Sequence, residues 1–201
     1  MAAAVAAALV PVAVAFAEAV GTPPPAAGSQ AVLEGLWTPE QLRAAPGDGR
    51  TKRLRPADHA PPAPLPAGIG VPSPPVPVAG SIRRVKPRDG DRPVALTFDL
   101  CERADQLSAY DGAVIDALRR ERAAATFFAG GKWMRSHPER AMQLIADPLF
   151  EVGNHGWTHG NLRLMRGEAV RQQIAWTQQE FALLRAELAR RAAAAAVPAV
   201  E

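Results

Sequence analysis

Apolar residues in the second half of the chain gather into three short runs, each followed by a polar loop and a longer amphipathic stretch. The runs are residues 93–100 (PVALTFDL), 124–129 and 150–154. The first has the composition of a strand buried on both faces of a parallel sheet, and the other two also predict strands. The amphipathic stretches, which predict helices, are residues 111–122, 136–146 and 170–191. This alternation of strands and helices predicts an α/β fold with a parallel sheet.

Capping residues mark where two of these helices should begin. Asp111 is expected to cap the first helix with its carboxylate. Ser136, with Glu139 three residues later, matches a capping box, so the second helix is expected to begin at Ser136. The third helix has an apolar stripe at steps of four and three residues. The stripe consists of Val170, Ile174, Thr177, Phe181, Leu184 and Leu188, and it leaves Trp176 unexplained.

The first half of the chain is rich in proline, with 15 of the 20 prolines between residues 22 and 87. Proline fixes φ and lacks an N–H donor, which excludes regular helix or interior strand over this span as a whole. We therefore expect residues 18–90 to form a disordered Pro/Ala-rich linker. Within it, residues 31–42 around Trp37 are interpreted as a transient helix, with a docking peptide as the alternative.

Residues 1–17 are apolar and end in Ala15-Phe16-Ala17, a pattern that signal peptidases cut. We expect this segment to be a signal peptide, which places the protein in a secreted or periplasmic location. It is too short and too rich in alanine for a stable membrane span. The alternative is an Ala-rich disordered N-terminus or a misplaced start codon, since the segment has no Lys or Arg.

The chain has a formal net charge of +3. The whole excess lies in residues 1–90, because residues 91–201 carry 14 basic and 14 acidic side chains. This balance argues against a nucleic-acid partner. The single cysteine excludes an intramolecular disulfide. Nothing in the composition indicates an oligomeric state.

Polar residues cluster where two of the predicted strands end, which is where parallel α/β sheets place functional groups. Those after the first strand are Asp99, Cys101, Glu102 and Asp105, and those after the third include His155 and His159. Two imidazoles four residues apart can bind one metal ion through their neutral nitrogens. A carboxylate from another strand is the natural third ligand, with positions left for water and substrate. The alternative, a histidine pair that caps a helix or fills the core, is less favoured.

The sequence also resembles the polysaccharide deacetylase family, also called the NodB-homology domain or carbohydrate esterase family 4. Thr97-Phe98-Asp99 resembles the start of its first motif, and His155-Gly156-Trp157-Thr158-His159 resembles its second. The resemblance covers residues 91–190 and implies the N-terminal half of a (β/α) barrel, followed by an Ala-rich tail over 191–201. The family's later motifs have no counterpart here, so we expect a C-terminally truncated chain that is unstable in isolation.

The resemblance also assigns roles to individual residues. It implies that Asp99 is the general base and that His155 and His159 hold a divalent ion, commonly zinc. Leu100 stands where the family has a second, metal-binding Asp, which leaves the third ligand open. Glu102 is the first candidate and Asp105 the next, while Asp99 itself is an alternative. Cys101 is interpreted as a small buried side chain rather than a ligand.

The function implied is a metal-dependent polysaccharide deacetylase that removes N-acetyl groups from N-acetylglucosamine-containing glycans, such as peptidoglycan or chitin-like polymers. The alternatives are a secreted, non-catalytic glycan- or metal-binding remnant and a structural metal-binding module. No substrate-binding residue is assigned, since Trp133 and Trp157 are interpreted as packing residues rather than sugar platforms.

Overall fold

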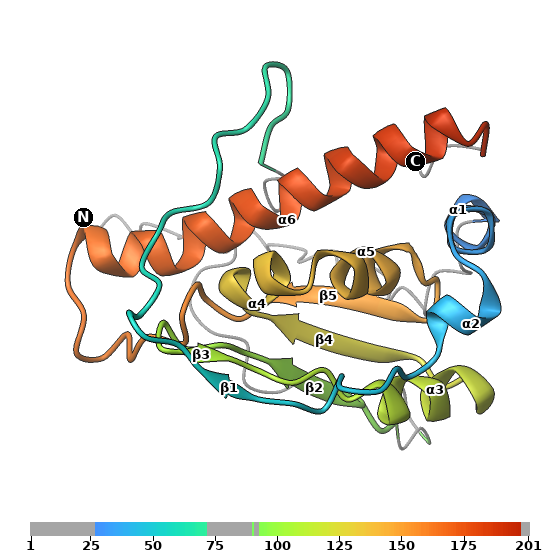
Figure 1. Cartoon of the computed structure of the whole chain (residues 1–201), viewed down its shortest axis with the longest axis horizontal. Coiled ribbons are helices and arrows are strands. Elements are labelled where there is room, and N and C mark those ends of the chain that lie inside the picture. Colours follow the sequence, from blue (N-terminus) through green and yellow to red (C-terminus); the bar gives the residue numbers. More distant parts are fainter. Residues whose placement is uncertain (1–26, 72–89, 91–92, 198–201) are drawn as a thin grey trace, which may run out of the picture.

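The computed structural model of the protein describes residues 27–71, 90 and 93–197. Within these residues a parallel sheet contains three strands in the order β2-β4-β5 (Figure 1). The strands are β2 (Thr97–Leu100), β4 (Ala125–Ala129) and β5 (Phe150–Asn154). The register places Asp99 opposite Phe128, and Phe128 opposite Gly153. The predicted α/β fold is therefore confirmed, although the first strand begins at Thr97 rather than Pro93.

Helices cover one side of this sheet. They are α3 (Gly112–Arg120), α4 (Gly131–Ser136), α5 (Pro138–Ala146) and α6 (Glu168–Ala194). Figure 1 shows α4 and α5 lying between the sheet and the long helix α6, which contacts both of them. Asp111 caps α3 as predicted, because its carboxylate accepts a hydrogen bond from the Val114 N–H at 3.3 Å.

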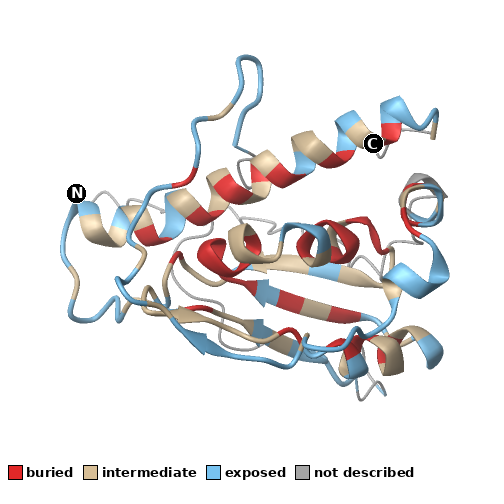
Figure 2. Ribbon diagram, in the orientation of Figure 1, coloured by how far each residue is buried: buried red, intermediate tan, exposed pale blue. Residues whose placement is uncertain are grey.

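The core lies between the sheet and these helices, as the burial pattern in Figure 2 shows. Phe127 stacks on Phe98 with ring centroids 5.3 Å apart and meets Phe150 edge-on at 5.0 Å. The opposite face of β4 is more open, and Phe128 there is 36% exposed. The prediction that the first strand is buried on both faces is wrong, because positions along β2 alternate between exposed and half-buried.

The predicted capping box at Ser136 is also wrong. Ser136 is the last residue of α4, and α5 begins at Pro138 with His137 as its N-cap. Proline at the first helical position supplies the fixed φ that starts a helix without any side-chain cap. The Ser136 hydroxyl instead donates a hydrogen bond to Glu102 at 2.8 Å.

The prediction of a disordered linker over 18–90 is wrong for residues 27–71. They contain α1 (Ala27–Leu36), α2 (Pro39–Leu42) and β1 (Lys52–Arg53), and β1 pairs antiparallel with β3 (Gln106–Leu107). Val32 and Trp37 are 0% and 6% exposed within the core. The indole N–H of Trp37 donates to Glu139 at 3.2 Å. The apolar residues around Trp37 are therefore part of the domain, because they bury against α5 and α6.

Two further boundaries can be compared with the structure. The expected tail over 191–201 begins too early, since α6 continues to Ala194 and Ala192 is 2% exposed. The predicted signal peptide over 1–17 lies outside the described residues. Within the part of the chain that the structure describes, no helix is both long and apolar enough to cross a membrane.

Candidate metal centre

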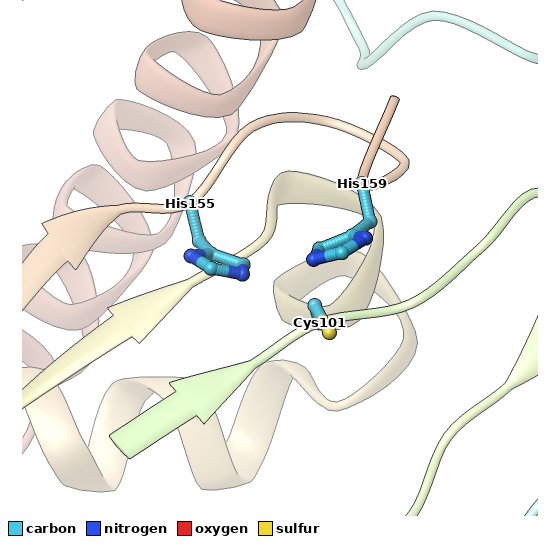
Figure 3. A group of neighbouring side chains, drawn as sticks. All are labelled: Cys101, His155 and His159. Atoms are coloured by element: carbon cyan, nitrogen blue, oxygen red, sulfur yellow. The ribbon is translucent and has the colours of Figure 1, made fainter. Parts of the chain in front are cut away.

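Three potential metal ligands meet at the carboxyl edge of the sheet. Cys101 follows β2, and His155 and His159 lie on the loop after β5. One ligand atom from each of them lies within 4.8 Å of the other two. Figure 3 shows the two imidazole rings above the Cys101 side chain, with ring centroids 5.1 Å apart. The loops after two strands thus bring a histidine pair and a thiol to one point.

His155 is fixed by its own backbone and by its neighbours. Its N–H continues the β4–β5 ladder by donating to the Ala129 carbonyl at 3.1 Å. One ring nitrogen, Nδ1, lies 3.7 Å from a carboxylate oxygen of Asp99. The other, Nε2, is buried and has no hydrogen-bond partner among the described residues. A buried nitrogen without a partner is costly, and a metal ion bound there would satisfy it.

The loop that carries His159 turns through two left-handed residues. Gly156 has φ +82°, which a glycine adopts without strain, and His159 itself has φ +54°. His159 is exposed, whereas His155 is half-buried. The second histidine is therefore the more accessible of the two to solvent.

Gln173 of α6 organises this loop, and no pattern in the sequence predicted this role. Its side-chain oxygen accepts hydrogen bonds from the N–H groups of Trp157 at 3.1 Å, Thr158 at 3.0 Å and Gly160 at 3.2 Å. Its amide nitrogen donates to the Thr158 hydroxyl at 3.0 Å. Gln173 is only 5% exposed. One buried carboxamide therefore holds the segment between the two histidines.

The start of α4 holds the same loop from the other side. The N–H groups of Gly131 and Lys132 donate to the carbonyls of Gly156 and Trp157 at 2.9 and 3.0 Å. A side chain at position 131 would collide with the Trp157 ring and would place its Cβ 2.8 Å from Thr177 Cα. Only glycine permits this close approach of α4 to the loop.

Trp157 is a packing residue, as predicted. It is 1% exposed and meets Trp176 edge-on, with ring centroids 5.8 Å apart. The Arg135 guanidinium lies 4.9 Å from the centre of the Trp157 ring. Trp176, which the apolar stripe of the sequence left unexplained, thus supports the loop that carries the two histidines from α6. Trp133 is likewise buried in the core, with 0% exposure.

Asp99 and Cys101 lie on the same side of the chain at the end of β2. Successive strand residues point to opposite faces, so Leu100 packs towards the core while the Asp99 carboxylate is 60% exposed. Cys101 is half-buried. Burial raises the pKa of the Cys101 thiol, and the neighbouring negative charge of Asp99 raises it further.

The structure does not bring Glu102 or Asp105 to the histidines, which corrects the assignment of Glu102 as third ligand. Glu102 is 1% exposed and forms a buried ion pair with Lys132. The same carboxylate accepts hydrogen bonds from the Ser136 hydroxyl at 2.8 Å and the Ser108 N–H at 3.3 Å. Asp105 pairs with arginines instead. Both side chains belong to interactions that hold the loop after β2.

The donors that do converge fit a zinc ion. Two imidazole nitrogens and one sulfur are a ligand set that zinc accepts, with a fourth position free for water or substrate. In a tetrahedral zinc site the donor atoms lie roughly 3.3–3.6 Å apart. The corresponding atoms of Cys101, His155 and His159 lie within 4.8 Å of one another, which is at most about 1.5 Å wider than that spacing.

A family profile described as polysaccharide deacetylase matches residues 86–194, which is more than half of the chain. The chain belongs to the polysaccharide deacetylase family. It is 32% identical over 90 residues to a chitooligosaccharide deacetylase of Rhizobium leguminosarum bv. trifolii, covering 44% of this chain and 39% of that protein. It is 35% identical over 80 residues to the peptidoglycan-N-acetylmuramic acid deacetylase PdaC of Bacillus subtilis, covering 39% of this chain and 16% of PdaC.

Among solved structures, the chain is similar to the peptidoglycan deacetylase PdaC from Bacillus subtilis. The sequence identity is 29% and the TM-score is 0.38, over 45% of this chain and 42% of that one. The chain spans less than half the length of each of these relatives.

Proposed function

We propose that this protein is a metal-dependent polysaccharide deacetylase, which hydrolyses N-acetyl groups on N-acetylglucosamine-containing glycans. The observation that carries the proposal is the meeting of His155, His159 and the Asp99 carboxylate at the carboxyl edge of the sheet, in a chain of this family. Family members are hydrolases that act on carbon–nitrogen bonds.

The ion would be held by the side chains of His155 and His159, and zinc is the proposed metal. An amide carbonyl is weakly electrophilic, and a bound divalent ion would supply the Lewis acid that this reaction needs. The buried, unpartnered Nε2 of His155 supports a role in binding the ion.

Asp99 is proposed as the general base. Its carboxylate is 60% exposed and lies beside His155, so it can reach a water molecule at the edge of the site. Taking the proton from that water as it attacks the acetyl carbon would contribute roughly 10²–10⁴-fold to the rate. The carboxylate also faces Nδ1 of His155 and would keep the ring oriented by accepting its N–H.

A glycan polymer is the proposed substrate, and peptidoglycan or a chitin-like polymer is the proposed class. Both Asp99 and His159 are exposed, so a long chain could approach them without entering an enclosed cavity. The names of two relatives refer to chitooligosaccharide and to peptidoglycan N-acetylmuramic acid. Such polymers lie outside the cytoplasm, which supports a secreted or periplasmic location.

A binding role without hydrolysis is the second candidate. The Cys101, His155 and His159 cluster would support it, because three convergent ligands can hold an ion whether or not a reaction follows. The two candidates share the metal site and differ only in whether acetate is released.

Acetate release from N-acetylated chitooligosaccharides separates them. The 201-residue chain is freed of metal with a chelator and reloaded with zinc, and the same treatment is given to His155→Ala and His59→Ala. His59→Ala is the control, because His59 is exposed and distant in sequence from His155. We expect zinc-dependent release that His59→Ala keeps and His155→Ala lowers at least about 100-fold. Stoichiometric zinc binding without any acetate release would leave the binding role instead.

A further inference from the structure

We infer that Cys101 is the third protein ligand of the metal ion, so that two imidazole nitrogens and one thiolate sulfur hold it. This inference rests on the proposed function and goes beyond it, because it replaces the expected carboxylate with a sulfur ligand. The geometric basis is that the sulfur and one nitrogen of each histidine lie within 4.8 Å of one another (Figure 3).

The backbone of β2 explains why position 101 contributes the ligand. Leu100 packs against the core, so its position faces away from the histidine loop. Asp99 and Cys101 flank it and lie on the other side, towards the open edge of the sheet. A ligand from the carboxyl end of β2 must therefore come from position 99 or 101.

The Asp99 carboxylate already lies beside a ring nitrogen of His155, so it is not placed as the third ligand. Its oxygen lies 3.7 Å from Nδ1 of His155. A small approach to hydrogen-bond distance would let the carboxylate orient the imidazole through the nitrogen that does not bind the ion. The buried Nε2 of the same ring has no hydrogen-bond partner among the described residues and is left for the ion. Asp99 thus supports the ring, while Cys101 remains free to bind.

The other acidic side chains after β2 are engaged elsewhere. The Glu102 carboxylate is occupied by the buried ammonium of Lys132, the Ser136 hydroxyl and a backbone N–H. Asp105 lies 3.4 Å from Arg103 and 3.9 Å from Arg53. Moving either carboxylate to the histidines would leave cationic groups without a carboxylate partner, and for Lys132 that group is buried.

A thiolate ligand changes which ion the site prefers. Sulfur ligands favour zinc and cobalt over magnesium, calcium and manganese, which prefer oxygen. When the sulfur–metal bond forms, the Cys101 S–H bond breaks and its proton passes to solvent. The bound thiolate and two neutral imidazoles reduce the charge of a divalent ion to +1, and the Asp99 carboxylate beside them stays available for the reaction.

The test uses the fact that Cys101 is the only cysteine in the chain. Cobalt titrated into the apo-protein should produce the near-ultraviolet charge-transfer band of a cobalt–thiolate bond, saturating at one ion per chain. Zinc should slow alkylation of Cys101 by iodoacetamide at least about tenfold, because the metal-bound sulfur is a poorer nucleophile. His155→Ala should lose both effects, and His59→Ala should keep them.

Two substitutions at the cysteine complete the experiment. Cys101→Ser should abolish the cobalt band and weaken zinc binding at least about tenfold. Cys101→Asp should restore binding without the band and reduce the preference for zinc over manganese. Far-ultraviolet circular dichroism of each apo-variant establishes that it is folded.

The outcomes distinguish this inference from the proposed function. One cobalt ion bound per chain without a thiolate band, together with an alkylation rate that zinc leaves unchanged, would overturn the role of Cys101. Zinc-dependent acetate release would then still stand. Acetate release by a chain that binds no metal would overturn both the metal-dependent mechanism and the Cys101 ligand.

Discussion

The Asp99 carboxylate lies 3.7 Å from Nδ1 of His155, and this contact joins the end of β2 to the end of β5. A proton on Nδ1 would point towards the carboxylate and leave the lone pair of Nε2 for a metal ion. The two strands are not neighbours, because β4 lies between them. The catalytic and metal-binding parts of the proposed site therefore depend on the correct assembly of all three strands.

Asp99→Asn separates the role of base from the role of ligand. The amide cannot take a proton, so we expect acetate release to fall by about 10²-fold or more. Zinc affinity should fall far less than it does in His155→Ala, because Asp99 lies outside the ligand group and the new amide oxygen can still accept the imidazole N–H. The measurements are the initial rate of acetate release and a zinc titration, with Asp105→Asn as the matched control. Unchanged acetate release by Asp99→Asn would exclude it as the base.

Gln173→Leu tests the support of the histidine loop. The substitution removes the acceptor for three backbone N–H groups, and each donor left buried without a partner costs about 1–3 kcal/mol. We expect the free energy of unfolding, measured by urea titration, to fall by at least about 2 kcal/mol. Zinc affinity should also fall, because the segment between the histidines loses its fixed geometry.

Two controls make that result specific. Gln173→Glu keeps an oxygen acceptor and should retain more zinc affinity than Gln173→Leu. Gln172→Leu changes the adjacent, only half-buried glutamine of the same helix and should have little effect on either quantity. Equal zinc affinity in wild type and folded Gln173→Leu would show that the loop does not need this side chain.

The hydrophobic pattern of the sequence predicted helix α6 but not which of its residues are buried. The predicted stripe includes Ile174, yet Ile174 is 48% exposed and its neighbour Gln173 is 5% exposed. Hydrophobic periodicity ranks residues by apolarity, so it cannot find a polar side chain that is buried because its hydrogen bonds are satisfied. The loop that carries the two histidines and the helix that supports it, α6, are separate elements in the sequence pattern, but they lie side by side in the fold.

The same limit applies to Glu102. It follows the first predicted strand and is the first carboxylate after Leu100, where the family has a metal-binding Asp, and this made it the first candidate for the third ligand. Its partner Lys132 is 30 positions away, and only the packing of α4 under the loop after β2 brings them together. In contrast, the strand ends, the histidine pair and the Asp111 cap were predictable, because each depends on local sequence.

Glu102→Gln tests whether this carboxylate is structural. Breaking one partner of a buried ion pair leaves the other charge uncompensated, so we expect the free energy of unfolding to fall by about 3 kcal/mol or more. The double substitution Glu102→Leu/Lys132→Met should cost less than the sum of the two single changes. Zinc affinity of the folded Glu102→Gln variant should stay within about threefold of wild type. A loss of about 100-fold with the fold intact would instead identify Glu102 as a ligand.

Glu180→Gln should alter the pH dependence of stability. Burial raises the pKa of Glu180 above 4.5, although the nearby Arg135 opposes this shift. Since the folded pKa is the higher one, stability is greatest below the unfolded value and falls as pH rises through the folded value. The variant should therefore gain stability relative to wild type at pH 7, and the gain should vanish near pH 4. Thermal unfolding at both pH values measures it, and an equal difference at the two would contradict the burial of this carboxyl.

The proline-rich half shows a different reason for a wrong prediction. Overall composition pointed to disorder, but a short apolar island around Trp37 buries against α5 and α6. Pro39 lies at the first turn of α2, where a missing N–H does no harm. Pro39 is compatible with a helix because it lies in the first turn. A count of prolines does not say where in a helix each proline lies.

Equilibrium zinc binding by the purified chain tests most directly whether His155 and His159 hold one metal ion. Wild type is compared with His155→Ala and His159→Ala, and His137→Ala is the control. His137 stacks on Trp133 outside the ligand group, with ring centroids 4.9 Å apart. We expect one zinc ion per chain for wild type and the control, and none measurable for either ligand variant at the same free zinc concentration. Zinc bound equally by wild type and His155→Ala would contradict it.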